Sequence, residues 1–266
     1  MDLLDYTIPV VDWVTDAGAY KSVPVDHNDL RFNDPLVCLS DFGIGCESFY
    51  ARSDGCNWPY RRRIEGSLAK VWCRRLVAER LQVANAFLLA HEAEVYVLDA
   101  YRPLATQVGL WSFFWNQSAD AMPGATDAQR RAYVLRYVSD PTRFQPRDPT
   151  TWPVHATGGA VDLTLRSLET GALLQMGAAF DDMQEASRSD ALERALLKHE
   201  INGDHAALRN RRLLHWAMSE AGFVNYPFEY WHFDWGDQMF VHHLAKSGKD
   251  TTKKAWYGYT PLPQDQ

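Results

Sequence analysis

The sequence predicts a mixed fold of helices and strands, and three observations support that prediction. A chain of 266 residues can bury a substantial core, and no repeat, linker or low-complexity segment divides it. Apolar residues recur at three- and four-residue steps over residues 64–91, which is the period of an amphipathic helix. Short apolar runs at residues 95–98 and 161–165 are typical of buried strands. We therefore expect a single domain over residues 1–266.

The composition argues against several classes of function. A formal net charge of -7 provides no basic surface for nucleic acid, and no stretch approaches the length of a membrane span. No nucleophile-elbow or Walker motif is present. Cys38, Cys46, Cys56 and Cys73 lack CxxC spacing, so we expect free, buried thiols rather than disulfides. The acidic N-terminus lacks the apolar run of a signal peptide, which predicts a cytoplasmic location.

The first part of the chain is expected to contain little regular structure before the first helix. Prolines and glycines interrupt residues 1–62, so irregular segments and short strands should wrap around the domain. The helix at 64–91 then leads into the strand at 95–98. Pro103 biases Arg102 toward an extended conformation. This places the arginine at the mouth of the strand, where functional side chains often project.

Two more helices and a loop follow this strand. A bulky apolar face predicts a helix over residues 104–116. Thr126 begins a third helix, over residues 126–139, because Gln129 stands three residues on as a capping-box partner. Four prolines in residues 140–153 indicate a loop.

The second half of the chain mixes short strands with helices. Thr170 and Gly171 are expected to form the turn of a hairpin, and Gly222 to end the last helix. The tail from residue 244 has no assignment. The expected elements are a strand at 161–165 with its hairpin return at 173–176, helices at 190–198 and 206–220, and strands at 223–224 and 230–235.

The stretch from His155 to Asp162 is the first candidate for chemistry. Two glycines and other small residues separate the two side chains, and a strand follows, so both can converge on one point. Imidazole and carboxylate are two of the three protein ligands of a catalytic zinc site. His232 is the best candidate for the third ligand. Glu229, three residues earlier, is suited to take a proton from water beside the metal and pass it to a leaving amine.

Structural explanations compete with this metal site. Taken singly, Asp162 could cap a turn and Arg102 could be a salt-bridge partner; only the combination favours chemistry. The adjacent His242 and His243 can also bind metal, but neighbours on a strand face opposite sides, so at most one would join a shared site. We assign five of the nine histidines to structural or solvated positions: His27, His91, His199, His205 and His215.

Six separated motifs resemble those of a known family. They are Tyr101-Arg102-Pro103, His155-x-x-Gly158-x-Ala160-x-Asp162, Met176-Gly177 with Phe180-Asp181, Asn210-Arg211-Arg212, Gly222-Phe223 and Glu229-x-Trp231-His232. With these motifs in this order, the chain resembles the D-alanyl-D-alanine dipeptidases of the vancomycin-resistance type, from about residue 60 to 236. These enzymes belong to a larger zinc peptidase group that includes D-alanyl-D-alanine carboxypeptidases and the hedgehog signalling domain.

The resemblance implies a fold and a set of roles. The fold would be α+β, with a central antiparallel sheet flanked by helices, which agrees with the elements expected above. One zinc ion per chain would be held by His155, Asp162 and His232. Glu229 would be the general base and then the acid. Two further roles are implied: Arg102 would stabilise the oxyanion, and Asp181 would receive the free ammonium group of a small dipeptide substrate.

The chain also departs from the family pattern. Family members commonly carry a serine two residues before the first histidine ligand, within the substrate pocket, and Pro153 stands there in this chain. The region between Asp181 and Asn210 is longer than usual. These departures leave the dipeptide and its stereochemistry open. The alternatives are a zinc carboxypeptidase acting on peptidoglycan stem peptides and a zinc-binding domain without catalysis.

Overall fold

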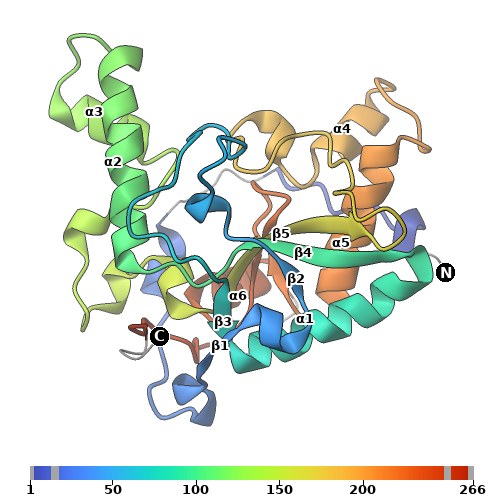
Figure 1. The fold of residues 1–266 in the computed structure, drawn as a ribbon, viewed down its shortest axis with the longest axis horizontal. Helices are drawn as coiled ribbons and strands as arrows, with labels where there is room; N and C mark the ends of the chain where they lie inside the picture. The colour runs from blue at the N-terminus through green and yellow to red at the C-terminus, as the bar shows by residue number, and fades with distance from the viewer. Residues whose placement is uncertain (1–2, 13–17, 249–252, 263–266) are drawn as a thin grey trace.

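A five-stranded sheet with the strand order β2-β4-β5-β7-β6 lies at the centre of the molecule (Figure 1). The structure is a computed structural model that describes residues 3–12, 18–248 and 253–262. Neighbouring strands are antiparallel, except that β2 runs parallel to β4 at one edge. The strands are β2 (Gly45–Cys46), β4 (Ala93–Asp99), β5 (Ala160–Ser167), β6 (Val224–Asn225) and β7 (His232–Asp234).

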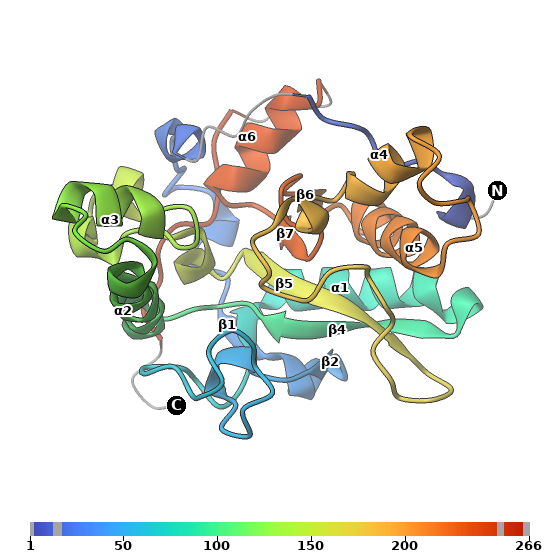
Figure 2. The same cartoon turned by 90° about the horizontal axis from the view of Figure 1, so that it is seen from above.

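Helices surround this sheet (Figure 2). Helices α2 and α3 lie at one end of the molecule and α4 and α5 at the other, while α1 packs against β4 and α5. Helix α6 contacts β6 and β7. The helices are α1 (Arg75–Leu88), α2 (Leu104–Ala121), α3 (Asp127–Val134), α4 (Ala191–Leu197), α5 (Ala206–Glu220) and α6 (Gln238–Lys246).

The segment before α1 contains short elements, as the sequence predicts. β1 (Leu36–Cys38) and β3 (Trp72–Arg74) form a separate antiparallel pair. The short 3-10 helices of this segment are η1 (Leu3–Asp5), η2 (Ala19–Ser22), η3 (Leu30–Asn33), η4 (Leu39–Phe42) and η5 (Phe49–Ala51). Those of the later loops are η6 (Leu89–His91), η7 (Pro141–Arg143), η8 (Pro149–Thr151), η9 (Val154–Thr157) and η10 (Glu185–Ser187).

The main core forms where α1 and α5 pack against the sheet. Its fully buried members include apolar side chains from both layers: Leu81, Leu88, Val95, Leu163, Leu165, Leu214 and Phe233. A second apolar cluster lies against α2 and contains Phe49, Tyr60, Leu110 and Phe114. Residues of the N-terminal segment therefore belong to the packed interior.

The expected α+β fold is confirmed, with one difference in the sheet. β2 is parallel to its neighbour rather than antiparallel. Parallel strands need a crossover connection, and the chain between β2 and β4 supplies one through β3 and α1.

The expected start of the first helix is wrong. α1 begins at Arg75 rather than at residue 64, and Arg74 before it is extended, with a ψ of 144°. Val71 and Trp72 were part of the expected helical period, yet the carbonyl of Val71 accepts a hydrogen bond from Leu39, and β3, which contains Trp72 and the buried Cys73, pairs with β1. The side chains of Val71 and Cys73 are buried by strand pairing instead of by a helix face.

Several other boundaries also differ from the prediction. The capping box of Thr126 and Gln129 is present, but α3 ends at Val134 instead of residue 139. The hairpin return at 173–176 is reduced to a single bridge between Arg166 and Leu173. α6 was not predicted, so His242 and His243 lie on a helix and not on a strand. The remaining helices and strands are confirmed, with ends that shift by a few residues.

The four cysteines are free thiols, as expected. Cys38 and Cys73 are buried, whereas Cys46 is half-buried and Cys56 is exposed, so the prediction of burial holds for two of them. No helix within residues 3–12, 18–248 and 253–262 is both long and apolar enough to cross a bilayer.

Replacement of Gly159, in the turn that leads into β5, is predicted to destabilise the fold. A Cβ atom at this position would lie 2.7 Å from the carbonyl oxygen of Trp235, which is backbone and cannot move freely. Overpacking of this kind costs about 1–3 kcal/mol, and we expect that loss for Gly159→Ala in urea unfolding. Gly203→Ala is the control, because nothing lies within 4 Å of its Cβ position. Equal stability of the two variants would contradict the prediction.

Candidate active site

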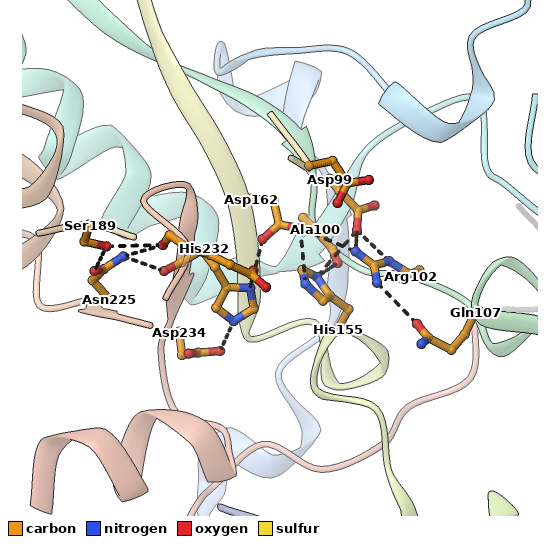
Figure 3. Close-up of polar contacts among 12 residues, drawn as sticks. Asp99, Ala100, Arg102, Gln107, His155, Asp162, Ser189, Asn225, His232 and Asp234 are labelled. Carbon is orange, nitrogen blue, oxygen red and sulfur yellow. Dashed lines mark hydrogen bonds and ion pairs between the residues drawn. The ribbon is translucent and has the colours of Figure 1, made fainter. Parts of the chain in front are cut away.

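The three predicted metal ligands converge where β5 meets β7 (Figure 3). Asp162 and His232 are direct cross-strand partners in this antiparallel pair, so their side chains emerge side by side. His155 comes from η9, which ends at Gly158 with a φ of 77° just before β5 begins. One ligand atom from each residue lies within 4.8 Å of the other two, and all three residues are buried.

His155 presents one ring nitrogen to this cluster. Its Nδ1 lies 2.8 Å from the carbonyl oxygen of Ala100. Because a carbonyl oxygen can only accept a hydrogen bond, the ring proton lies on Nδ1. Nε2 then points at Asp162, 3.3 Å from Oδ2. Burial, and after it the charge of Arg102, lower the pKa of His155 to about 3. A neutral imidazole with a free Nε2 lone pair is the form that binds metal.

His232 is held between two carboxylates. Its Nδ1 lies 2.9 Å from Asp162 Oδ1, and its Nε2 lies 3.0 Å from Asp234 Oδ1. Burial disfavours the charged ring, but Asp234 and Asp162 outweigh it and hold the pKa of His232 well above its usual value. A metal ion would replace the proton on Nδ1, while Asp234 would keep its hydrogen bond to Nε2.

These residues fit a zinc ion. Two histidines and a carboxylate make a three-ligand set of the kind found in catalytic zinc sites, which leave a fourth position for water. Each histidine uses its other ring nitrogen for an oxygen acceptor, which is the usual support of a metal ligand. The acceptor behind His232 was missed from the sequence. Asp234 stands two residues along β7, on the same face, and this spacing is the signal that could have found it.

A second carboxyl group, that of Asp237, lies next to Asp234. Asp237 accepts a hydrogen bond from the backbone of Phe240 and thereby caps α6. Both aspartates are fully buried. Burial, with the charge of Asp234 next, raises the pKa of Asp237 well above its usual value. A protonated Asp237 leaves one negative charge in the pair, and that charge faces His232.

Arg102 lies beside the cluster at the end of β4, as predicted. Asp99 anchors it, since Nε donates to Asp99 Oδ2 at 2.8 Å. Nη1 donates to Gln107 at 3.2 Å, and Nη2 lies 3.3 Å from the Tyr50 hydroxyl. Nη2 also lies 3.4 Å from Asp162 Oδ2 (Figure 3). The guanidinium is therefore fixed, and one edge of it is directed at the metal cluster.

Glu229 reaches the same cluster from the turn between β6 and β7. The turn is closed by the amide of His232, which donates to the carbonyl of Glu229 at 3.3 Å. Asn225 supports it further, because its side chain donates to the carbonyl of His232 (Figure 3) and also to that of Glu229. The expected strand at 230–235 is thus shorter, and a turn rather than a twisted strand brings the two side chains together.

The Glu229 carboxylate is set for proton transfer. Its Oε2 lies 3.9 Å from Nδ1 of His232. Burial raises the pKa of Glu229 to about 7; His232 opposes the shift and Asp162 adds to it. A group with this pKa can both accept and release a proton near neutral pH.

Asp181 lies at the Arg102 side of the site. Tyr60 donates to its Oδ2 at 2.6 Å and Tyr50 at 3.3 Å. Its backbone has a φ of 63°, a strained conformation for a residue other than glycine. Burial raises the pKa of Asp181 to about 6, although Tyr60 and Arg102 oppose the shift. The two tyrosines were missed from the sequence, because they lie in a segment without a recognisable motif.

One cavity of about 910 Å³ joins these groups. It is lined by all six predicted site residues: Arg102, His155, Asp162, Asp181, Glu229 and His232. Pro153 also lines it, in the place where the family pattern has serine. None of the other histidines lines this cavity or joins the metal cluster found among the described residues. The geometry brings the predicted residues together, and their individual roles stay predictions.

The chain is similar in sequence to a family of dipeptidases. Residues 50–250 match a protein-family model described as D-ala-D-ala dipeptidase. A D-alanyl-D-alanine dipeptidase of Streptomyces coelicolor is 38% identical over 211 residues, which cover 77% of this chain and 90% of that protein. The same enzyme of Synechocystis is 29% identical over 70% of this chain and 75% of its own length. That of Escherichia coli is 36% identical over 53% of this chain and 54% of its own.

Among solved structures, the chain is similar to VanYB in complex with D-Alanine-D-Alanine. That match has 16% sequence identity and a TM-score of 0.41, and it covers 72% of this chain and 86% of the other.

The carboxylate of Asp181 is predicted to lower the stability of the fold as the pH rises. A pKa raised to about 6 means that the folded state binds this proton more tightly than the unfolded chain does. Stability is therefore lost as the pH rises from about 4 to about 6. In the metal-free protein, we expect Asp181→Asn to gain up to about 3 kcal/mol over wild type across this window.

Urea unfolding of both proteins at pH 4 and at pH 8 measures this gain. Asp182→Asn, at a neighbouring position that does not line the cavity, controls for the loss of one negative charge. A stability difference between Asp181→Asn and wild type that is the same at both pH values would show that Asp181 titrates normally.

Proposed function

The chain belongs to the D-Ala-D-Ala dipeptidase family of zinc peptidases, and from this premise we propose that it hydrolyses D-alanyl-D-alanine or a closely related dipeptide. One observation carries the proposal. A three-residue metal cluster, a carboxylate beside it, an arginine and a second carboxylate all line the same cavity. Metal-assisted hydrolysis of a dipeptide with a free amino group can use all of these groups.

We assign the zinc ligands to His155, Asp162 and His232. When bound, Zn²⁺ lowers the pKa of a water molecule and polarises the peptide carbonyl. The chain prepares the ligands for this role through their hydrogen bonds. Ala100 holds the tautomer of His155, and Asp234 holds the ring of His232. These contacts keep the ligand atoms in place before the metal arrives.

Glu229 acts as the proton carrier. In the metal-free protein its pKa is about 7, in the range of groups that exchange protons near neutral pH, and its carboxylate form can accept the proton of the attacking water. The protonated form can then donate to the nitrogen of the departing amino acid. Asn225 fixes the backbone on which Glu229 stands, so the carboxylate keeps its distance from His232.

Arg102 stabilises the negative charge that develops on the carbonyl oxygen. Its guanidinium is held by Asp99 and Gln107 and does not need to reorganise during the reaction. A positioned positive charge of this kind contributes several kcal/mol to transition-state stabilisation, about 3–4 by comparison with oxyanion holes.

Asp181 selects the free amino group of the substrate. Tyr60 and Tyr50 orient its carboxylate, and its position beside Arg102 in the same cavity lets it bind an ammonium group close to the reacting bond. A substrate whose amino group is blocked would offer no cation to this buried carboxylate. The pairing therefore supports a dipeptidase over an enzyme that trims longer, N-blocked chains.

We also propose that residues 1–266 form one domain and that it acts in the cytoplasm. Tyr50 and Tyr60, from the segment before α1, complete the binding site for the substrate amine, which supports the first point. The free state of all four cysteines suits a reducing compartment, which supports the second. D-alanyl-D-alanine would connect the reaction with peptidoglycan and the cell wall.

Glu229→Gln is expected to keep zinc and lose turnover. The amide cannot carry the proton, and general acid–base catalysis contributes about 10²–10⁴-fold to the rate. Steady-state hydrolysis of D-alanyl-D-alanine measures the loss, with zinc content determined by elemental analysis. Glu220→Gln, at an exposed position on α5, is the matched control and should match wild type. Wild-type turnover in Glu229→Gln would exclude Glu229 as the base.

His232→Ala is expected to lose bound zinc. Removal of one of three protein ligands leaves two, which is too few for a stable catalytic site. His242→Ala, on α6 and outside the metal cluster, should keep one zinc ion per chain. Elemental analysis after dialysis measures both. Full zinc content in His232→Ala would show that another residue is the third zinc ligand.

A further inference from the structure

The cavity is larger than a small dipeptide requires. At about 910 Å³ it lies near the upper end of pockets that hold drug-sized ligands, roughly 300–1,000 Å³. The groups assigned to catalysis and to the substrate amine account for only part of its lining. Much of the rest comes from residues 131–154 and from the N-terminal segment.

Tyr20 belongs to this second part of the cavity. Tyr20 lines the cavity and is buried next to Ser139. Burial raises the pKa of its hydroxyl group, and the charges of Asp234 and Asp237 add to that shift. Asp181 instead contacts the tyrosines on the Arg102 side. Because Asp181 and Tyr20 line one cavity, a dipeptide with its ammonium group at Asp181 can extend its departing residue toward the Tyr20 part.

The backbone of Lys21 is held in place at this part of the cavity. The side chain of Gln238, on α6, donates to the carbonyl of Lys21 at 3.1 Å and to that of Val23 at 2.7 Å. The Lys21 side chain lines the cavity and is half-buried, and burial lowers the pKa of its ammonium group. Residue 21 stands outside the part of the chain that matches the family model, residues 50–250.

Two arginines add to this positive charge. Arg136 and Arg143 line the cavity, and no carboxylate of the described residues forms an ion pair with either of them or with Lys21. Asp140 is the only acid among the lining residues between 131 and 154, and it is already paired with Arg131. This second part of the cavity therefore carries three cationic side chains without an ion-pair partner among the described residues; Lys21 is half-buried, and Arg136 and Arg143 are exposed to solvent.

We propose that Lys21, Arg136 and Arg143 form an anion-binding subsite for the departing residue, so that the preferred dipeptides carry an acidic side chain on that residue. The inference rests on the proposed dipeptidase function. The departing residue always presents one α-carboxylate, which Lys21 is placed to bind. A second carboxylate, on the side chain, then meets the two arginines, whose planar forks suit carboxylate. Pro153, which replaces the family's serine in the pocket, has neither a hydroxyl nor an N–H to offer the substrate.

The experiment compares matched substrates with the zinc-loaded full chain. D-Ala-D-Asp and D-Ala-D-Asn have nearly the same shape and differ by one negative charge. We expect kcat/KM to be about tenfold higher for the acid, as one charge-assisted pairing provides. In the double variant Arg136→Gln/Arg143→Gln the ratio should fall to about one. Arg147→Gln, in the same loop but outside the cavity, should keep the wild-type ratio.

Lys21 is tested separately from the arginines. Lys21→Gln should raise KM for D-Ala-D-Ala about tenfold and should leave KM for the C-terminal amide of the same dipeptide unchanged. Direct binding gives a readout independent of turnover. Titration calorimetry of the Glu229→Gln variant should show tighter binding of D-Ala-D-Asp than of D-Ala-D-Asn, and the difference should shrink at high salt.

The outcomes separate the two proposals. Hydrolysis of D-Ala-D-Ala by wild type with an acid-to-amide ratio near one overturns the subsite and leaves the dipeptidase function intact. An acid-to-amide ratio of kcat/KM that stays at the wild-type value in the double arginine variant also overturns the proposed subsite. If no dipeptide is hydrolysed, the proposed function fails. The calorimetric preference for the acid, present with the arginines and lost without them, would still support the subsite in that case, and its absence would reject it.

Discussion

The pairing of β5 with β7 is the constraint on which the site depends. It places Asp162 opposite His232, so two of the three candidate ligands are neighbours by register. A slip of one residue would turn one of them to the other face of the sheet. Gly159 permits the close approach of the Trp235 carbonyl, and the amide of Trp235 donates back to Gly159. The register is thus maintained next to the ligands themselves.

The site concentrates buried charge, and that charge is offset locally. His232 lies between Asp162 and Asp234, and Arg102 lies against Asp99. Burying an isolated charge is far more costly than burying a hydrogen-bonded pair. These pairs therefore keep the side chains ordered without the metal. Zinc would enter a preorganised site, where the ligand atoms already face one another.

The groups that we propose for catalysis and those that we propose for substrate recognition come from different parts of the fold. The sheet and its adjoining turns supply the metal cluster and Glu229, which rigid elements can hold at fixed distances. The loops and the N-terminal segment supply Asp181, Tyr50, Tyr60 and Lys21. Loops tolerate change more readily than the strands they join, so substrate preference can diverge while the metal chemistry stays the same.

The local pattern of the sequence determined the elements with strong periodicity and the identity of the chemical groups. The strands around 95–98 and 161–165, the helix at 206–220 and the capping box at Thr126 all follow from short-range spacing and propensity. The six motifs were sufficient to select the residues that the cavity brings together. Short-range signals carry this information because they depend only on neighbours along the chain.

Contacts between distant residues decided the rest. Val71 and Trp72 fit a helical period, but strand pairing with the N-terminal segment removes them from α1. Asp234 accepts a hydrogen bond from His232 because β7 places both side chains on the same face of the sheet. The positions of Tyr60 and Lys21 in the cavity depend on how the first sixty residues wrap around the sheet. Such contacts leave no periodic trace in the sequence, because neither partner needs a particular neighbour along the chain.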